Sequence, residues 1–301
     1  MAEINKIELR GAYKCIPYVV LAPGIALMLI LNYYPIAQAL FRSFFLWRGG
    51  EKATFVGLEN FRELMADPAF KISMIHLLKL LSIRLVFIIF IPLFVAELIF
   101  ELSYHKHLRR FFRVLYILPV VIPTIVILLI WQFIYDGSIG LLNNALKSLG
   151  FSYLTRDWLG SPETSLYAIA FISFPWVHPY LCALILLTCL AALQNVDREI
   201  FDVCKIDGAG GLIRFFKIDL GLILDQMKVM LILAIIMLIQ DFIGILILTN
   251  GGPGYATMVP GVYLYQNAFY YARMGYACAI GIVIFGLVFT LTIIVRMLQA
   301  R

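Results

Sequence analysis

Four charged or amide side chains interrupt stretches of the sequence that are otherwise apolar. Lys79 and Arg84 lie in one such stretch, and the pair Gln240-Asp241 lies in another. A charge at the centre of a bilayer costs at least about 2.5–3.5 kcal/mol on insertion scales, so such residues pair with one another or serve a function. Two interpretations stay open: Asp241 forms an interhelical ion pair with Lys79 or Arg84, or these side chains line a polar path across the membrane.

A second group of candidates surrounds two prolines. Trp176 and Tyr180 lie in the sequence Pro-Trp-Val-His-Pro-Tyr, residues 175–180. A proline-flanked break in a membrane helix exposes backbone carbonyls and can form a binding site at mid-membrane depth. Aromatic faces at such a site would suit stacking against a sugar ring. A kinked helix with interfacial aromatic residues is the alternative.

Other reactive residue types lack the partners that catalysis requires. His178 has no second ligand nearby in the sequence, and one imidazole is not a metal site. The five cysteines form no Cys-x-x-Cys pair, which favours small buried hydrophobic residues. Residues 251–254, Gly-Gly-Pro-Gly, are not followed by the Lys-Ser/Thr of a Walker motif and are interpreted as a turn. The sequence therefore predicts neither an enzyme nor a chain that itself holds a cofactor or metal.

The elements that position these residues must lie in a membrane. The chain has 301 residues, of which 62% are hydrophobic and 14% charged, and its mean hydropathy is +0.93. Soluble domains contain about 25% charged residues. The net charge of +6 is then attributed to basic loops beside the membrane rather than to nucleic-acid binding. The length fits a single membrane domain, residues 1–301, without a sizeable soluble enzyme.

Hydropathy predicts an all-α protein with about six membrane-spanning helices. About 20 apolar residues are needed to cross the hydrocarbon core. The first stretch is too long for a signal peptide and is expected to remain as a helix. The six predicted spans cover residues 16–40, 73–99, 114–135, 165–193, 229–249 and 275–298.

The distribution of basic residues predicts the orientation of these spans. Of the 24 Lys and Arg residues, 14 lie in one alternating set of connecting segments, which includes both termini, and 8 lie in the other. The positive-inside rule therefore places both termini in the cytoplasm. The predicted location is a bacterial inner membrane, crossed several times.

The longest predicted cytoplasmic loop, residues 194–228, is amphipathic rather than simply polar. The run Asp207-Gly208-Ala209-Gly210-Gly211 can turn sharply, because glycine adopts positive φ without a steric penalty. Phe215 and other apolar residues beside the turn could fill a groove on a partner, as amphipathic helices do. Arg214 and Lys217 could then meet acidic residues of that partner.

The spacing within this loop resembles a known signature. It reads Asp202-Val203-Cys204, three residues, Gly208, nine residues, Ile218, one residue, Leu220-Gly221. This is similar to the cytoplasmic signature of binding-protein-dependent ABC importer permeases, in which Glu-Ala-Ala, Gly and Ile-x-Leu-Pro occur at the same spacing. Here Asp202 replaces the Glu, Val203 and Cys204 replace the two Ala, and Gly221 replaces the Pro.

Three further stretches resemble the carbohydrate branch of that family, so that the resemblance covers roughly residues 15–300. They are Thr-Phe-Val-Gly-Leu-Glu-Asn-Phe at 54–61; residues 111–143, with Pro119, Pro123, Trp131 and Gly-Leu-Leu-Asn at 140–143; and Thr-Asn-Gly-Gly-Pro-Gly-Tyr-Ala-Thr at 249–257, followed by Tyr265, Ala268-Phe269 and Gly275-Tyr276-Ala277.

The resemblance implies a type I ABC importer permease that works by alternating access. Its partners would be a second, homologous and usually different permease subunit, two ATPase subunits that bind ATP and Mg²⁺, and an extracytoplasmic solute-binding protein. The loop at 194–228 would dock on an ATPase subunit and transmit its closure. The substrate would be a sugar or oligosaccharide.

Alternatives differ in substrate or in energy source. If Lys79 and Arg84 line the path, an acidic sugar such as a uronate oligosaccharide, or a phosphorylated polyol, becomes a candidate substrate. An ion-coupled secondary transporter would need inverted repeats around broken helices, and the sequence shows no matching halves. A membrane-embedded enzyme would need a nucleophile, a metal cluster or a carboxylate pair, none of which is evident.

Overall fold

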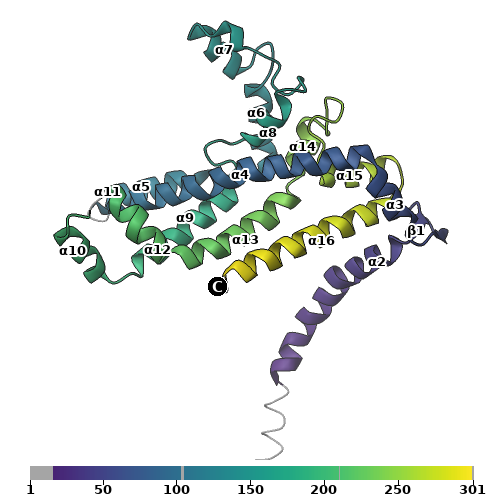
Figure 1. Ribbon diagram of the computed structural model, residues 1–301, viewed down its shortest axis with the longest axis horizontal. Helices are drawn as coiled ribbons and strands as arrows, with labels where there is room; N and C mark the ends of the chain where they lie inside the picture. Colours follow the sequence, from purple (N-terminus) through teal and green to yellow (C-terminus); the bar gives the residue numbers. More distant parts are fainter. Residues whose placement is uncertain (1–15, 103–104, 210, 300–301) are drawn as a thin grey trace, which may run out of the picture. The chain divides into compact units, whose positions relative to one another are not determined.

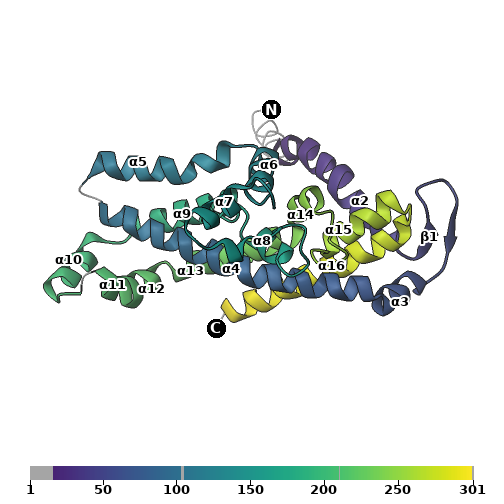
Figure 2. The same ribbon diagram turned by 90° about the horizontal axis from the view of Figure 1, so that it is seen from above.

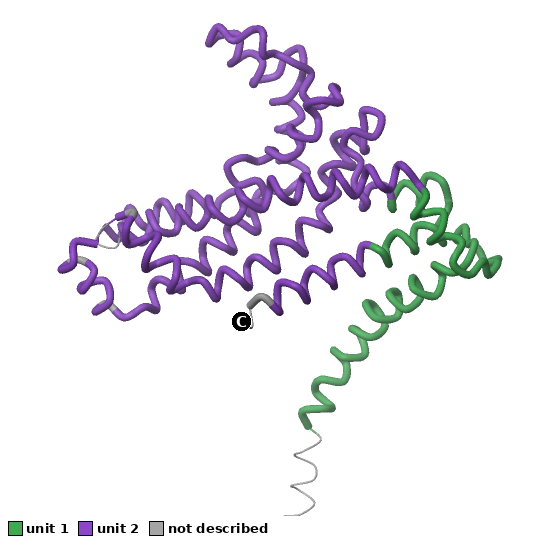
Figure 3. The backbone as a smooth tube through the Cα atoms, viewed as in Figure 1, with its two compact units in different colours: residues 1–66, 264–283 green, residues 67–263, 284–301 purple. Residues whose placement is uncertain are grey.

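The computed structural model describes residues 16–102, 105–209 and 211–299, and these are mostly helical (Figure 1). The chain divides into two compact units (Figure 3). One contains residues 1–66 and 264–283, and the other contains residues 67–263 and 284–301. Helix α16 (Met274–Gln299) therefore begins in the first unit and ends in the second.

The first unit begins with an apolar helix, Ile16–Arg42, which includes the π-helical turn η1 (Leu29–Tyr33) and α2 (Tyr34–Arg42). A short antiparallel hairpin, β1 (Phe45–Trp47) and β2 (Ala53–Phe55), follows and leads into α3 (Glu59–Ala66). The π-helical turn η6 (Gln266–Tyr270) precedes α16. A Cβ atom on Gly275 would lie 2.0 Å from the carbonyl oxygen of Phe45, so only glycine lets α16 approach the hairpin this closely.

The second unit is organised around α4 (Pro68–Glu101), a helix of 34 residues. Asp67 caps its start, since one carboxylate oxygen accepts a hydrogen bond from the Ala69 amide at 2.9 Å. Helices α9 (Pro179–Gln194) and α13 (Leu224–Gln240) pack against α4 (Figure 2). Ile88, Leu186 and Ala234, one from each of these helices, are completely buried at their meeting point.

Shorter elements complete the second unit. They are α5 (Lys106–Ile117), η3 (Leu118–Val121), α6 (Thr124–Ile134), α7 (Leu141–Ser148), η4 (Ser152–Leu154), α8 (Ser165–Ala170), α10 (Arg198–Ile206), α11 (Gly211–Arg214), η5 (Phe215–Asp219), α12 (Leu220–Leu222), α14 (Ile243–Leu248) and α15 (Pro260–Tyr265). A second apolar cluster joins α4, α6, α8, α14, α15 and the segment before α15, with Ile169, Ile245 and Val262 at its centre.

Four helices in the described part of the chain are long and apolar enough to cross a membrane: Ile16–Arg42, Pro68–Glu101, Leu224–Leu248 and Met274–Met297. They correspond to the predicted spans at 16–40, 73–99, 229–249 and 275–298. The remaining two predicted spans, 114–135 and 165–193, are not continuous helices. The break within 165–193 agrees with one of the two interpretations of its prolines, whereas the break within 114–135 corrects the prediction.

The two interruptions share a physical cause. Lys106–Val121 and Thr124–Ile134 are bent by 92° relative to each other, and Ile122 between them is extended, with ψ of 126°. The second interruption separates α8 from α9, and His178 there is extended, with ψ of 93°. Each extended residue directly precedes a proline, whose ring disfavours helical geometry in the residue before it.

Candidate functional site

Three helix breaks in the second unit meet at one cavity of about 290 Å³, named here the breakpoint cavity. One break lies between η3 and α6, the second between α8 and α9, and the third between α13 and α14. Side chains from each break line the cavity, including Ile122, Thr124, His178, Tyr180 and Asp241, and Arg84 reaches it from α4. Interrupted helices leave backbone groups without intrahelical partners, and in a membrane these are tolerated where they line a polar cavity.

The polar centre of the breakpoint cavity is an ion pair between Arg84 and Asp241. A guanidinium nitrogen lies 2.8 Å from a carboxylate oxygen, with the Arg84 side chain 8% and the Asp241 side chain 31% exposed. The other terminal nitrogen of Arg84 donates to the carbonyl oxygen of Ile169 at 2.9 Å. Ile169 lies in the last turn of α8, where carbonyls lack helical partners and favour a cation. Of the two predicted partners for Asp241, Arg84 is confirmed.

The six residues predicted for a path do not all gather here. Arg84, Asp241 and Tyr180 line the breakpoint cavity, whereas Lys79 and Gln240 are exposed and are not part of its wall. Trp176 is turned elsewhere, because its indole nitrogen donates to the carbonyl of Tyr116 at 2.9 Å.

Sequence reasoning missed the position of His178. It lines the cavity, and its ring nitrogen Nδ1 accepts from the amide of Leu181 at 3.4 Å, so it also caps α9. The proline that follows it, at the first position of a helix, was the available signal for a cap at His178.

The loop predicted at 194–228 folds into short helices between residues 198 and 222, called the 198–222 segment below. Helix α10 ends at a turn in which the amide of Asp207 donates to Val203 at 2.9 Å and that of Ala209 donates to Cys204 at 2.8 Å. Gly208 has φ of 69°, a left-handed conformation that commonly ends helices. The predicted turn at Asp207-Gly208-Ala209 is thereby confirmed.

This segment has a buried face and an exposed face. Cys204 and Phe215 are buried within the second unit. In contrast, Val203 is 55% and Ile206 is 84% exposed, and Asp202 is exposed beside them. Apolar side chains that remain exposed on an ordered segment favour a surface that contacts a partner.

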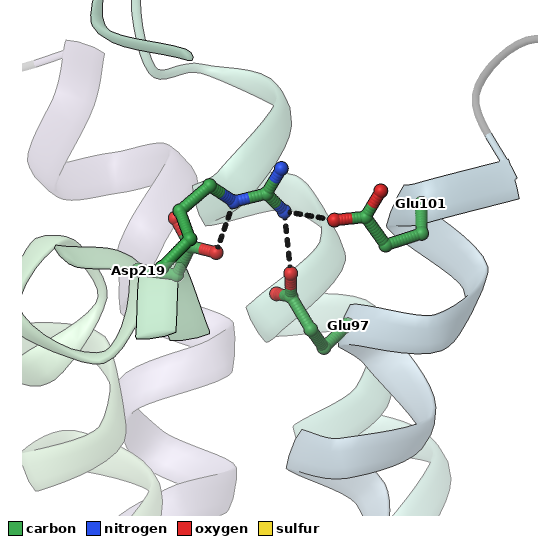
Figure 4. Close-up of polar contacts among 4 residues, drawn as sticks. Glu97, Glu101 and Asp219 are labelled. Carbon is green, nitrogen blue, oxygen red and sulfur yellow. Dashed lines mark hydrogen bonds and ion pairs between the residues drawn. The ribbon is translucent and has the colours of Figure 1, made fainter. Parts of the chain in front are cut away.

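Arg214 is the centre of the buried face (Figure 4). One terminal nitrogen lies 2.6 Å from carboxylate oxygens of both Glu97 and Glu101, and its Nε lies 2.8 Å from Asp219. These four residues are the Arg214 cluster. Its guanidinium also lies 5.3 Å from the ring centre of Phe201, a cation–π contact. The prediction that Arg214 meets acidic residues of a partner is corrected, because its own chain supplies three carboxylates.

The charge balance of the Arg214 cluster is unusual. Burial by itself lowers the pKa of Arg214, but the hydrogen bond and charge of Asp219, the charge of Glu101 and the hydrogen bond of Glu97 outweigh it and raise that pKa. The guanidinium is therefore permanently charged. Among the described residues, Glu97 Oε2 and Asp219 Oδ1 are buried without a hydrogen-bond partner. Removing Arg214 would leave these groups without their cation.

Helix α4 connects the two polar sites. Arg84 in the breakpoint cavity and Glu97 in the Arg214 cluster both belong to it. Their separation of 13 positions corresponds to about 20 Å along a helix that rises about 1.5 Å per residue. Pro92 lies inside α4 between these two residues, where a proline removes one backbone hydrogen bond and can bend the helix.

Comparisons with known proteins find relatives along most of the chain. The family model for binding-protein-dependent transport system inner membrane components matches residues 88–301. The probable ABC transporter permease YurN of Bacillus subtilis is 34% identical over 276 residues, which is 90% of this chain and 91% of YurN. The arabinooligosaccharide transport permease AraP of the same species is 30% identical, over 95% of this chain and 89% of AraP.

A crystal structure is also similar in fold. It is that of a bacterial ABC transporter involved in the import of the acidic polysaccharide alginate. One of its chains superimposes with a TM-score of 0.83 at 21% sequence identity, covering 98% of this chain and 99% of that chain.

Proposed function

Because the chain belongs to the family of binding-protein-dependent transport system inner membrane components, we propose that it is the channel-forming subunit of an ATP-driven importer for a sugar or oligosaccharide. The observation that carries the proposal is the breakpoint cavity, in which three interrupted helices surround an ion pair within an apolar bundle. The substrate class is supported by AraP, whose name specifies arabinooligosaccharides, and by the alginate importer.

The proposed topology has six crossings with both termini in the cytoplasm. The four long helices supply four crossings, the bent pair α5–α6 a fifth, and α8 with α9 a sixth. The excess of basic residues in the connections that include both termini supports the orientation. Both compact units then belong to one permease domain, residues 1–301.

The proposed partners follow from the family and from the 198–222 segment. A second, homologous permease would complete the channel, an external solute-binding protein would deliver the sugar, and two ATPase subunits would bind ATP and Mg²⁺. The exposed residues Asp202, Val203 and Ile206 form the surface proposed to enter an ATPase groove, with the turn at Gly208 beside it. Arg214 acts inside the chain, where it attaches this surface to α4.

The proposed mechanism is alternating access. Closure of the ATPase subunits displaces the 198–222 segment, and the Arg214 cluster transfers the displacement to α4. Arg84 moves with α4, while Asp241 and the carbonyl of Ile169 belong to other elements, so the contacts around the cavity change. The cavity then becomes accessible from one side or the other.

The acidic-sugar alternative is less well supported by the cavity. The positive charge of Arg84 is already balanced by Asp241 at 2.8 Å. Lys79, the other cation considered for this role, is exposed and is not part of the cavity wall. The cavity therefore offers a neutral polar surface with an aromatic side chain, Tyr180, which suits a neutral sugar.

Purification and transport of the complete complex test the proposal. We expect an ATPase subunit to copurify with the tagged chain, and uptake into proteoliposomes to require ATP and the binding protein. Uptake that proceeds on an ion gradient without ATP would contradict it.

The docking surface is tested by Ile206→Glu, which places a charge on its most exposed apolar residue. The amount of copurified ATPase should fall at least about tenfold, because a docked interface does not accommodate an unpaired carboxylate. Ile139→Glu is the matched control, since Ile139 is 61% exposed in the loop before α7. Equal retention of the ATPase by both variants would place the docking surface elsewhere.

A further inference from the structure

An apolar groove separate from the breakpoint cavity lies between α4 and α5. It has a volume of about 620 Å³, which is within the usual range for ligand pockets of about 300–1,000 Å³. Val95, Leu98 and Leu102 form its wall on the side of α4, Phe112 and Leu115 form the wall on the side of α5, and Trp176 also lines it. Figure 2 shows α5 running beside the end of α4.

The groove offers almost nothing to a polar ligand. The indole nitrogen of Trp176 is already used by the carbonyl of Tyr116 at 2.9 Å. The carboxylate of Glu101, the acidic residue of the lining, lies 2.6 Å from Arg214. A ligand that fills the groove must therefore be apolar where it lies between the two helices.

The helix that forms one wall of the groove, α5, is strongly basic. Helix α5 contains Lys106, Arg109, Arg110 and Arg113 and no acidic residue. Residues three or four apart share a helix face, so Arg109 lies on the side of Phe112, and Arg113 lies on the side of Tyr116. Arg109 is half-buried, and Nε of Arg113 is buried without a hydrogen-bond partner among the described residues. Arg110 lies on the opposite side and is exposed.

We propose that this groove binds an anionic phospholipid, with one acyl chain between α4 and α5 and the phosphate on Arg109 and Arg113. An apolar slot whose wall helix also contains cationic side chains matches a molecule with a hydrocarbon tail and a negative head group. Basic residues near a membrane surface attract anionic lipids, and pockets of this kind between helices bind their head groups. The proposal depends on the chain lying in a membrane and not on the identity of its transported substrate.

The position of the groove gives the lipid a role. Glu101 belongs both to the groove wall and to the Arg214 cluster. A lipid that holds α5 against the end of α4 therefore stabilises the helix end to which the 198–222 segment is attached. Coupling of ATP hydrolysis to transport should then be stronger in bilayers that contain anionic lipid.

Quenching of Trp176 by brominated lipids tests the site directly. In the complete complex, the other three tryptophans of this chain, Trp47, Trp131 and Trp158, and those of the partner subunits are replaced by Phe. The complex is then reconstituted with brominated phosphatidylglycerol or brominated phosphatidylcholine. Half-maximal quenching should need at least about fivefold less phosphatidylglycerol than phosphatidylcholine, the effect expected for one engaged basic residue. A complex in which Trp131 on α6 is retained instead is the reference for ordinary lipid contact.

Charge variants then decide whether α5 recognises the head group. Arg109→Gln with Arg113→Gln should remove the preference for phosphatidylglycerol, whereas Arg110→Gln, the same change on the opposite side of the helix, should preserve it. Native mass spectrometry of the complex with all its tryptophans supplies an independent count of retained phosphatidylglycerol. Equal quenching by both lipids would overturn the proposal. So would the absence of quenching by either, which would mean that a protein helix covers the groove.

Discussion

Two buried arginines, Arg84 on α4 and Arg214 on α11, illustrate two different uses of a charge in this molecule. Arg214 is surrounded by three carboxylates from Glu97, Glu101 and Asp219 and by aromatic rings. Arg84 has one carboxylate, that of Asp241, and one backbone carbonyl, and it borders a cavity. The contacts of Arg214 attach the 198–222 segment to α4 through several ion pairs. The contacts of Arg84 attach α4 to two helix breaks through one ion pair and one hydrogen bond.

In the proposed mechanism, this difference predicts which contacts change and which stay in place. Separating the guanidinium of Arg214 from its carboxylates on α4 and η5 costs much, since the buried carboxylates of Glu97 and Asp219 would lose their counter-ion. The Asp241 side of the Arg84 pair is 31% exposed and borders the breakpoint cavity, so the pair can rearrange at lower cost. In the proposed mechanism, the contacts of the Arg214 cluster therefore stay in place, and the contacts around the breakpoint cavity change.

Arg214→Met should give the largest effect. It leaves Glu97 and Asp219 buried without a counter-ion, and breaking a buried ion pair from one side costs about 3–5 kcal/mol. We expect a marked fall in the melting temperature of the purified complex and in the yield of assembled complex, measured by size exclusion after heating. Lys217→Met is the matched control, because Lys217 lies on the same segment and is exposed. If both variants have the same melting temperature, the Arg214 cluster does not attach the 198–222 segment to α4.

Arg84→Met should have a smaller effect on stability and a larger one on uptake. It removes a hydrogen bond to Asp241 and one to Ile169, and hydrogen bonds to charged groups contribute about 1.5–3 kcal/mol each. The loss should be reduced because Asp241 is 31% exposed. ATP-dependent uptake should fall at least about tenfold while the ATPase still copurifies.

The double variant Arg84→Met with Asp241→Asn sharpens this prediction. It removes both charges, so it should be more stable than Arg84→Met alone, and the double-mutant cycle should give a coupling energy of about 0.5–3 kcal/mol. Additive losses in the two single variants would show that the pair contributes no coupling, and Arg84 would then act through Ile169 alone.

The sequence was sufficient to predict the parts of this comparison that depend on local chemistry. Hydropathy identified the four long helices, and Gly208 identified the turn of the 198–222 segment. Two of the three breaks contain prolines, and the extended residues Ile122 and His178 precede them. The break within 165–193 was one of the two interpretations of its prolines, whereas the break within 114–135 was not predicted, because hydropathy does not register such breaks.

The remaining features depend on contacts between distant residues. The third break, at Asp241, contains no proline, and Asp241 leaves the helix where Arg84 of another element binds its carboxylate. The partners of Arg214 on α4 are more than 110 positions away in the sequence. A sequence pattern confined to residues 194–228 could not reveal that the carboxylates bound by Arg214 belong to the same chain.

The smallest effect is expected from Lys79→Met, which tests whether a positive charge anywhere on this part of α4 is enough or whether it must lie in the breakpoint cavity. Lys79 lies five residues before Arg84 on the same helix, but it is exposed and is not part of the breakpoint cavity. Exposed substitutions away from such features usually change stability by less than about 0.5 kcal/mol. We therefore expect uptake and melting temperature close to those of the unmodified complex, measured beside Arg84→Met in the same preparation. A loss of uptake as large as that of Arg84→Met would show that positive charge along α4 defines the path. The pairing of Arg84 with Asp241 would then not explain why Arg84 is needed for uptake.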